Sequence, residues 1–209
     1  MGAVLVLGSL VVLVVTQLIA QAAWQDPPYD VTFNNISDLG NVFCQPWSDD
    51  QRYVCSPRHA VANGGFLAGG ALLIAGLVLL RPLWKRTRLG LVAWLFLFGG
   101  GLLWITAGYW PADVNEGLHL TAFLWLWLAQ VGLVVTGAGL SPLAPRPLRV
   151  LAPIFGVVGL VMVFAFLGQQ YFGLGRGIAE RIAVYSVSLW MTLLAAWVIW
   201  DRTVNPRNR

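Results

Sequence analysis

A small set of polar side chains could carry out acid–base or nucleophilic chemistry in this otherwise apolar sequence. The stretch NISDLG at positions 35–40 supplies a hydroxyl and a carboxylate, while Glu116 and His119 supply a second carboxylate and an imidazole. The imidazole is the side chain that most often exchanges a proton near neutral pH. We therefore expect His119 to act as a general base that Asp38 or Glu116 orients. Ser37 is the candidate nucleophile.

A second group of polar residues is a candidate for substrate binding. Among them, Arg181 could hold a phosphate or an oxyanion, because a guanidinium donates charge-assisted hydrogen bonds in a fixed fork. Polar groups near the ends of membrane spans usually face the bundle or water, so these residues could converge on one pocket. The candidate substrate-binding residues are Asn35, Asn63, Asp113, Glu180, Arg181 and Tyr185.

Each of these residues also has a purely structural interpretation. Asp38 could close a local turn before Gly40, as short acidic side chains often do. Asn63 could bond a neighbouring helix, and His119 could bond a backbone group. Arg181 could form a structural ion pair with Asp38 or with Glu116, in place of binding an anion.

Metal and haem sites are further alternatives. His119, Asp38 and another carboxylate could hold a divalent cation around a water molecule. The sequence itself requires no cofactor. It contains no His-Glu-x-x-His and no Gly-x-Ser-x-Gly string, which counts against an enzyme. His59 and His119 could ligate one haem, but both lie near the expected membrane boundary rather than within the spans. The colour of the purified protein tests that interpretation.

The composition indicates which elements must position these residues. The chain has 209 residues, of which 58% are hydrophobic and 11% are charged, and its mean hydropathy is +0.72. Soluble domains carry about 25% charged residues. The apolar residues form runs of roughly 20, long enough to cross a bilayer as helices. We expect an all-α polytopic membrane protein with one domain over residues 1–209. Its six spans are 3–23, 60–80, 89–109, 118–140, 150–168 and 182–200, and residues 24–59 form a cap loop.

The first span has a second interpretation as a signal peptide. Ala20-Gln21-Ala22 resembles a cleavage site. However, the segment lacks a basic start, and its apolar run is longer than that of a typical signal peptide. We expect it to be retained as a helix.

The charges of the loops predict the orientation. The termini and the loops on their side carry nine basic residues and one acidic residue, a charge of +8, while the other loops carry four basic and eight acidic residues, a charge of −4. Basic loops stay on the cytoplasmic side. We therefore expect a multi-pass protein of the cell membrane with both termini in the cytoplasm and the candidate residues outside.

The same charge pattern bears on the partners. The basic residues form short flanks without an aromatic platform, so it predicts no nucleic acid. Membrane lipids are the expected partners. A membrane-protein partner or a second copy of the chain is an alternative partner.

Cys44 and Cys55 are both on the expected outer side, where a disulfide can persist. Ten residues separate them, a loop of easily closed size. Closing it would stabilise the cap by roughly 2–3 kcal/mol on a chain-entropy argument. We expect the disulfide, and two free buried thiols are the alternative.

Several short motifs resemble a bacterial family. They are Ile-Ser-Asp-Leu-Gly at 36–40, Cys-Ser-Pro at 55–57, Asn63, Pro-x-Asp at 111–113, His119, and Glu180-Arg181. Over essentially all six spans the chain resembles the bacterial integral membrane family called domain of unknown function 998. The resemblance implies a six-helix membrane protein with no established activity. The Ile-Ser-Asp-x-Gly string is also similar to one in DRAM-type and GPI-lipid-remodelling membrane proteins of eukaryotes, which implies lipid handling.

Two functions of different classes fit these observations. The first is a hydrolase, transferase or remodelling factor that acts on a lipid or lipid-linked substrate at the outer leaflet. The second is a non-catalytic lipid or small-molecule binding protein, or an accessory membrane subunit. Transport is less well supported, because no span has a Gly/Pro-broken centre with paired ionisable groups. A His119→Gln protein that folds but loses activity would favour the first.

Overall fold

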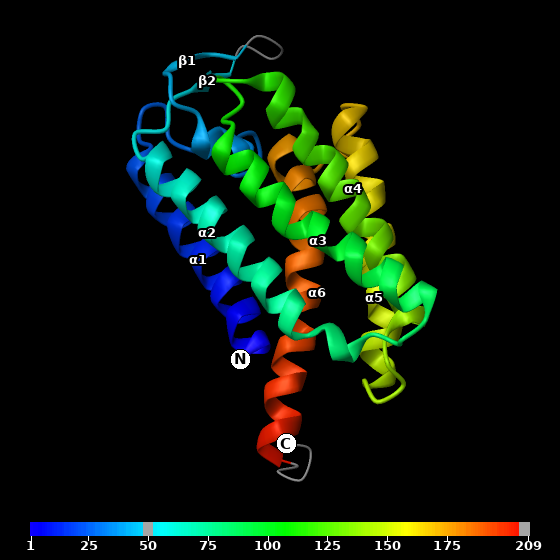
Figure 1. Ribbon diagram of the computed structural model, residues 1–209. Coiled ribbons are helices and arrows are strands. Elements are labelled where there is room, and N and C mark those ends of the chain that lie inside the picture. The colour runs from blue at the N-terminus through cyan, green and yellow to red at the C-terminus, as the bar shows by residue number, and fades with distance from the viewer. Residues whose placement is uncertain (48–51, 205–209) are drawn as a thin grey trace.

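Long helices dominate the computed structural model of the chain, which describes residues 1–47 and 52–204 (Figure 1). Within these residues six helices are long and apolar enough to cross a membrane. They are α1 (Gly2–Ala23), α2 (His59–Leu79), α3 (Arg88–Tyr109), α4 (Glu116–Gly139), α5 (Arg146–Leu167) and α6 (Arg176–Val204). The expected class, an all-α multi-pass membrane protein, is confirmed.

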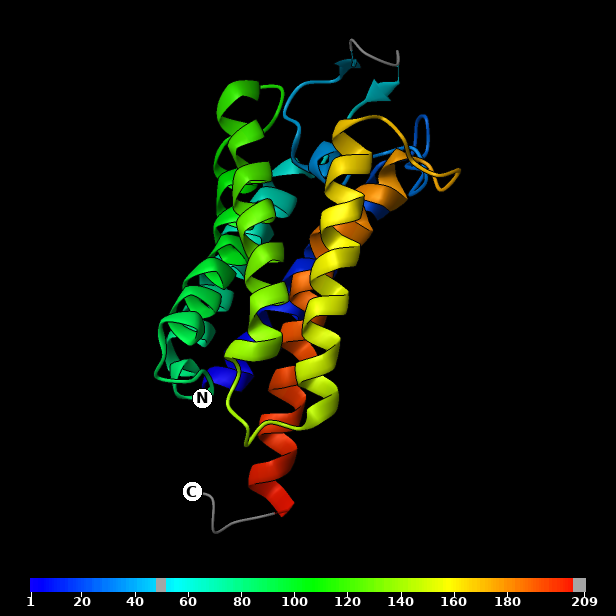
Figure 2. The same ribbon diagram turned by 90° about the vertical axis from the view of Figure 1, so that its right-hand side faces the viewer.

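The helices pack in chain order around a closed ring. Each one contacts the next, and α6 contacts α1, α3 and α4 in addition to α5. Figures 1 and 2 show that α1 begins and α6 ends at the same end of the bundle, while the loops of the cap cover the opposite end. An even number of spans gives this arrangement.

Apolar side chains between the helices form two buried clusters, one in each half of the bundle. One cluster includes Trp84 and Trp190, and the other, at the capped end, includes Trp24, Leu39 and Trp104. Because Leu39 comes from the cap, the cap is packed into the bundle rather than lying loosely on it.

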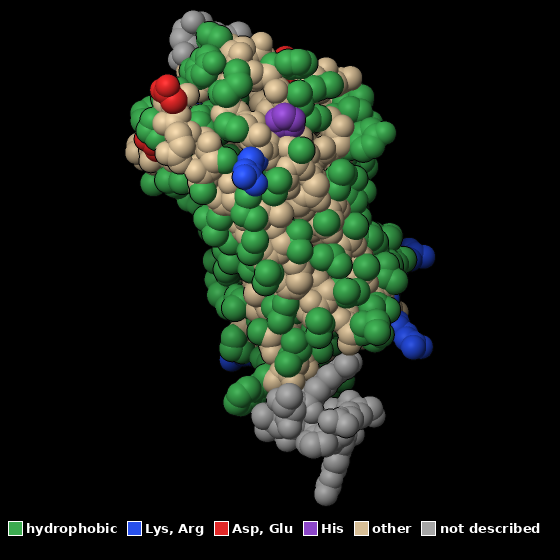
Figure 3. Space-filling view, turned by 90° about the vertical axis from the view of Figure 1, so that its left-hand side faces the viewer, with side chains coloured by type: hydrophobic (Ala, Val, Ile, Leu, Met, Phe, Trp, Pro, Cys, Tyr) green, Lys and Arg blue, Asp and Glu red, His purple; other side chains and the backbone are tan. Residues whose placement is uncertain are grey.

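The outer surface is apolar over the middle of the bundle. On the face shown in Figure 3, hydrophobic side chains cover this middle zone and the visible acidic side chains lie at the capped end. A surface of this kind suits a lipid environment. Asp49, Asp50, Arg207 and Arg209, which the charge balance included, lie outside the described residues.

The helix ends differ from the expected spans chiefly in α5 and α6. The fifth span was expected from 150 and the sixth from 182, but α5 begins at Arg146 and α6 at Arg176. The additional turns contain charged residues, which an argument from hydropathy leaves outside a span. Glu180 and Arg181 consequently lie within the second turn of α6.

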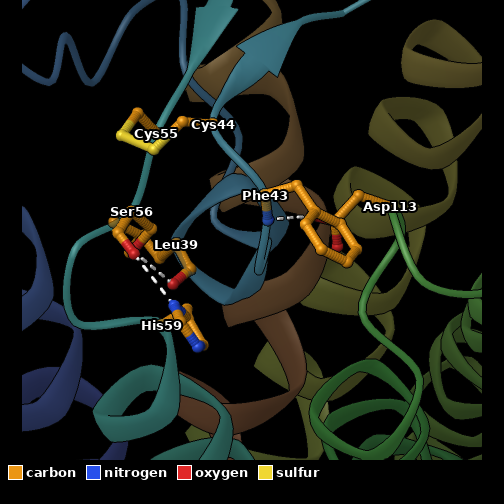
Figure 4. Close-up of a disulfide and its surroundings, with 7 residues drawn as sticks. All are labelled: Leu39, Phe43, Cys44, Cys55, Ser56, His59 and Asp113. Atoms are coloured by element: carbon orange, nitrogen blue, oxygen red, sulfur yellow. Dashed lines mark hydrogen bonds between the residues drawn. A yellow bond between two sulfur atoms is a disulfide. The ribbon is translucent and has the colours of Figure 1, made fainter.

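The cap contains one short helix and one hairpin. The 3₁₀ helix η1 (Ser37–Gly40) is buried and contacts α1, α2 and α3. The strands β1 (Gln45–Pro46) and β2 (Tyr53–Val54) pair antiparallel. Cys44 and Cys55, next to the two strands, form the expected disulfide (Figure 4). This bond holds the base of the hairpin closed.

Candidate functional site

Two adjoining cavities lie between the cap and the capped ends of the helices. The larger cavity, which we call the vestibule, has a volume of about 170 Å³. The smaller one, the chamber, lies deeper and has a volume of about 30 Å³. Ser37, His119 and Phe123 line both cavities, so these three residues mark the junction between them.

The vestibule has a polar and charged lining. Its acidic residues, Asp38 and Glu116, are matched by two basic residues, Arg52 and Arg176. Arg52 binds both carboxylate oxygens of Asp38, through Nη2 at 2.9 Å and Nε at 3.1 Å. Both side chains of this pair are largely buried, with exposed fractions of 4% for Asp38 and 11% for Arg52. The Asp38 carboxylate also accepts a hydrogen bond from the backbone N–H of Asn35, at 2.8 Å.

Aromatic rings form the side of the vestibule near α5. Phe123 of α4 stacks on Phe166 of α5 with ring centroids 5.4 Å apart. The guanidinium of Arg176 lies over the Phe166 ring, 5.7 Å from its centroid, and Arg176 Nε donates to the Asn35 side chain at 3.2 Å. This chain of contacts connects the start of α6 to the cap.

The chamber is almost entirely apolar. Its lining comes from η1, α2, α3, α4 and α6, and the apolar members are Ile36, Phe66, Leu103, Trp104, Ala107, Ala122, Phe123, Leu126 and Val184. The polar lining residues Ser37, His119 and Glu180 complete the set. The two cavities together therefore offer a charged outer part and an apolar inner part.

His119 is held in one orientation at the junction of the cavities. Its Nδ1 lies 2.7 Å from the backbone carbonyl oxygen of Trp110. A carbonyl can only accept, so Nδ1 carries the hydrogen and, in the neutral imidazole, Nε2 has a free lone pair. Nε2 makes no hydrogen bond to any described residue. The backbone contact that the sequence left open is thus present, and it leaves one nitrogen available as a base.

Glu180 binds the start of η1. Its carboxylate accepts hydrogen bonds from the backbone N–H of Ile36 and from the Ser37 hydroxyl, the latter at 3.2 Å. Glu180 is buried in the described structure, with an exposed fraction of 6%. The Ser37 hydroxyl therefore points to Glu180, and Glu180 rather than His119 is its hydrogen-bond acceptor.

Arg181 fastens the cap to α6. Its guanidinium donates to the carbonyl oxygens of Val31 and Asn34, at 2.9 and 3.0 Å, and to the hydroxyl of Tyr29. The alternative ion pair of Arg181 with Asp38 or Glu116 is not seen among the described residues, and Asp38 binds Arg52 instead. Burial raises the pKa of Tyr29, so its phenol stays protonated and donates to the Asn35 carbonyl oxygen, at 2.8 Å.

Three other candidate binding residues lie away from both cavities. Asn63 donates to the Gly40 carbonyl oxygen at 2.8 Å, and Asp113 accepts from the Phe43 backbone N–H at 2.6 Å (Figure 4). Tyr185 donates to Gln17 of α1 at 2.8 Å. The first two contacts hold the cap against α2 and the α3–α4 link. All three have structural partners in place of a ligand.

Of the candidates, the structure brings Asn35, Ser37, Asp38, Glu116, His119 and Glu180 to the two cavities. Sequence reasoning did not select Arg52, Arg176, Phe166 or Trp104, which also line them. Arg52 and Arg176 lie in loops by hydropathy, and nothing in their immediate sequence marks them. The aromatic residues look like ordinary span residues in the sequence.

The donor sets for a metal or haem are incomplete. Among residues 1–47 and 52–204 no group of three or more His, Cys, Asp or Glu side chains is placed to share a metal ion. His59 bonds the Ser56 carbonyl oxygen through Nδ1 at 3.1 Å (Figure 4) and lines neither cavity. Of the two histidines, His119 is therefore the one that lines the cavities.

The bundle, the cap and the two-part cavity define a multi-pass membrane protein with a buried polar site at one end. The family model described as "Protein of unknown function (DUF998)" matches residues 6–197. The chain belongs to this family, as its motifs predicted. No curated protein and no solved structure matches the chain significantly.

Proposed function

We propose that the protein handles an amphiphilic lipid at the outer leaflet of the cell membrane. The headgroup occupies the vestibule, and the beginning of one hydrocarbon chain occupies the chamber. The observation that carries this proposal is the pairing of a charged cavity with an apolar one through the shared residues Ser37, His119 and Phe123. An amphiphile is the class of ligand that has both surfaces.

Access from the bilayer is supported by two leucines at the edge of the vestibule. Leu120 of α4 and Leu167 of α5 line the vestibule and are also 50% and 54% exposed. They lie at the outer ends of neighbouring helices. A lipid can therefore enter between α4 and α5 while the rest of its chain stays in the membrane. The chamber, at about 30 Å³, is too small to enclose a whole chain.

The outer-leaflet assignment follows from the loop charges. The loops at the capped end sum to −4 and the opposite side to +8. Under the positive-inside rule the capped end faces away from the cytoplasm, and both termini are cytoplasmic. The protein is then a cell-membrane protein whose partners are membrane lipids.

Hydrolysis or transfer of the lipid is the reaction that His119 supports. Its Nε2 can take a proton from a water molecule or hydroxyl that attacks a carbonyl at the junction of the cavities. The Trp110 carbonyl, rather than Asp38 or Glu116, orients the ring. Glu180 would assist if Ser37 were the nucleophile, because the Ser37 hydroxyl donates to it.

Binding without catalysis is a second candidate, and one observation favours it. A serine hydrolase needs its hydroxyl bonded to the base that accepts the proton, often an imidazole. Here Ser37 bonds Glu180 and its backbone neighbour Ile36 bonds the same carboxylate. Because the carboxylate also bonds the backbone of the cap, this arrangement suits holding the cap in place over a bound lipid better than activating Ser37.

The proposal is tested by blocking the chamber. In the Ala122→Phe variant a ring fills the chamber, whereas the Leu124→Phe variant places a ring on the exposed surface of the same helix, where Leu124 is 55% exposed. Each protein is purified in mild detergent and its bound lipid is measured by native mass spectrometry. We expect wild type and Leu124→Phe to carry comparable lipid and Ala122→Phe several-fold less. Equal lipid on all three proteins would refute the proposal.

A further inference from the structure

Two loops that are far apart in the sequence present exposed apolar side chains together at the capped end. The cap contributes Val31 and Phe33, which are 44% and 65% exposed. The α5–α6 link contributes Phe172 and Leu174, which are 68% and 39% exposed. We call these four residues the apolar shelf. Exposed apolar side chains that gather on a surface usually mark a contact with another protein or with a membrane.

Thr32 joins the two loops. Its carbonyl oxygen accepts a hydrogen bond from the Gly177 N–H, near the start of α6, at 2.8 Å. Gly175 also lies against it, because a Cβ added to Gly175 would be 2.6 Å from the same oxygen. Gly175 has a φ of +83°, which glycine adopts without strain. Glycine is therefore required at this contact, and the two halves of the shelf form one surface.

The turn that carries Phe172 is unfavourable for a phenylalanine. The Leu174 N–H donates to the Tyr171 carbonyl oxygen at 2.9 Å, and the two central residues, Phe172 and Gly173, have φ values of +52° and +76°. Turns with positive φ at both central positions usually hold Gly, Asn or Asp there, and a bulky residue in this conformation is rare. Packing inside the protein does not explain the ring either, since Phe172 is 68% exposed. The role of this ring therefore lies outside the protein.

The shelf lies beside the capped end of α5 rather than above it. In Figure 2 the link between α5 (yellow) and α6 (orange) projects sideways from the bundle, with a blue segment of the cap next to it. The last turn of α5 exposes Phe164 and Leu167, at 61% and 54%, so apolar surface leads from the helix to the link. Phe and Leu side chains of interfacial segments insert at the boundary between headgroups and acyl chains. A bilayer therefore fits this surface better than a soluble partner.

We propose that the apolar shelf is a membrane-docking surface, which inserts among the headgroups of the leaflet at the capped end. This inference is independent of the proposed lipid site, since it requires only that the six helices span a bilayer. It gives the α5–α6 link two sides. Phe172 and Leu174 contact the leaflet, while Gln169 and Tyr171 line the vestibule. The leaflet would thereby hold this wall of the vestibule in place.

Site-directed spin labelling tests the docking directly. The two native cysteines form the disulfide, so Phe172→Cys and Phe33→Cys each introduce a single reactive thiol. The labelled full-length proteins are placed in phospholipid nanodiscs, and electron paramagnetic resonance measures how often the label collides with oxygen and with a water-soluble nickel chelate. Oxygen concentrates in the bilayer and the chelate in water. We expect the ratio of oxygen to nickel collisions to be several-fold higher at both positions than at a control position in water.

Tyr53 of β2 provides that control. It is an aromatic residue at the same end and is 41% exposed, but it belongs to the hairpin, which lies beyond the capped end of α5 in Figure 2. The label on Tyr53→Cys should give the low ratio of a group in water. Labels at positions 172 and 33 that are as accessible to nickel as the label at 53 would overturn the proposal and would point to a protein partner.

The wild-type protein gives a second test that needs no substitution. A phospholipid with a photoreactive diazirine beside its headgroup is added to the nanodiscs, and after illumination the modified residues are identified by peptide mass spectrometry. We expect adducts within residues 31–33 and 172–174 and none within β1 and β2. Adducts confined to the helices would overturn the proposal. The chamber-blocking variant Ala122→Phe keeps the shelf, so it should give the same adducts even if the lipid site is lost.

Discussion

His119 combines one fixed nitrogen with one available nitrogen at the junction of the two cavities. The bond from Nδ1 to the Trp110 carbonyl sets the orientation of the ring at little cost, because it satisfies both polar groups. The fixed ring orientation then sets the direction of Nε2, which bonds no described residue. A general base requires this arrangement, since a base already bonded to the protein could not accept a proton from a substrate.

Replacing His119 by Asn should remove the base and keep the structural bond. The Asn amide can still donate to the Trp110 carbonyl oxygen, but nothing replaces Nε2. If the protein is a hydrolase or transferase, we expect lipid binding to persist and turnover to fall by roughly 10²–10⁴-fold. Lipid products are measured by mass spectrometry after incubation with a total lipid extract.

His59 gives the matched control for this prediction. It makes the same kind of Nδ1 contact, to the Ser56 carbonyl oxygen, and lines neither cavity. The His59→Asn variant should turn over lipid as wild type does. Equal turnover by His119→Asn would exclude His119 as the base, and a wild type without turnover would favour the binding function.

At this scale the sequence indicated the polar residues but not their partners. Ser37, Asp38 and His119 stand out because polar groups are rare in this chain. Their partners, Glu180, Arg52 and the Trp110 carbonyl, come from distant segments or from the backbone. Such pairings depend on how the cap folds onto the helices, and no local pattern encodes that.

The helices position the site through close contacts that the small residues allow. On α2, Gly65 faces α1, and a Cβ added there would lie 1.9 Å from Thr16 Oγ1 and 2.5 Å from Thr16 Cβ. The Thr16 hydroxyl donates to the Val12 carbonyl oxygen at 2.8 Å, so this side chain has a defined rotamer. The adjacent Gly64 has open space around it. A substitution at Gly65 therefore reports on the packing of α1 against α2, whereas a substitution at Gly64 reports on helix propensity alone.

Substitution of these glycines by alanine should have opposite effects. Gly65→Ala should lower the free energy of unfolding by about 1–3 kcal/mol, because Thr16 cannot move away without breaking its contacts. Gly64→Ala should leave it unchanged or raise it by up to about 1 kcal/mol, because alanine favours the helix. Equilibrium unfolding in mixed micelles measures both. Similar destabilisation by both variants would contradict the described contact between α1 and α2.

At the scale of elements, hydropathy predicted the six spans well and their polar ends poorly. The starts of α1, α2 and α3 lie within one residue of the expected positions, since apolar runs define them. The first turns of α6 were missed because Arg176, Glu180 and Arg181 are charged. Those turns remain helical because the cap supplies partners for the charges, including the Ile36 N–H and the Asn35 side chain.

The whole molecule has one polar, capped end and one basic end, and this asymmetry underlies the proposed orientation. The chain has two cysteines, and they form the disulfide, so any introduced cysteine is a unique thiol. Gln170 is exposed in the α5–α6 link at the capped end. Leu143, 88% exposed, is in the α4–α5 link at the opposite end.

Cysteines at these two positions should report the orientation. In intact cells, a maleimide that cannot cross the bilayer should label Gln170→Cys and not Leu143→Cys. Permeabilised cells provide the control, in which both should be labelled. Labelling of Leu143→Cys alone in intact cells would show that the capped end faces the cytoplasm and would move the proposed lipid site to the inner leaflet.

The most direct test of the lipid site is a cryo-electron microscopy structure of the full-length protein in nanodiscs that contain ester-linked phospholipid. We predict lipid density with its headgroup in the vestibule beside Asp38 and Arg52 and its first acyl segment in the chamber beside Trp104. Ordered lipid confined to the outer surface of the bundle, with both cavities free of lipid density, would contradict the account.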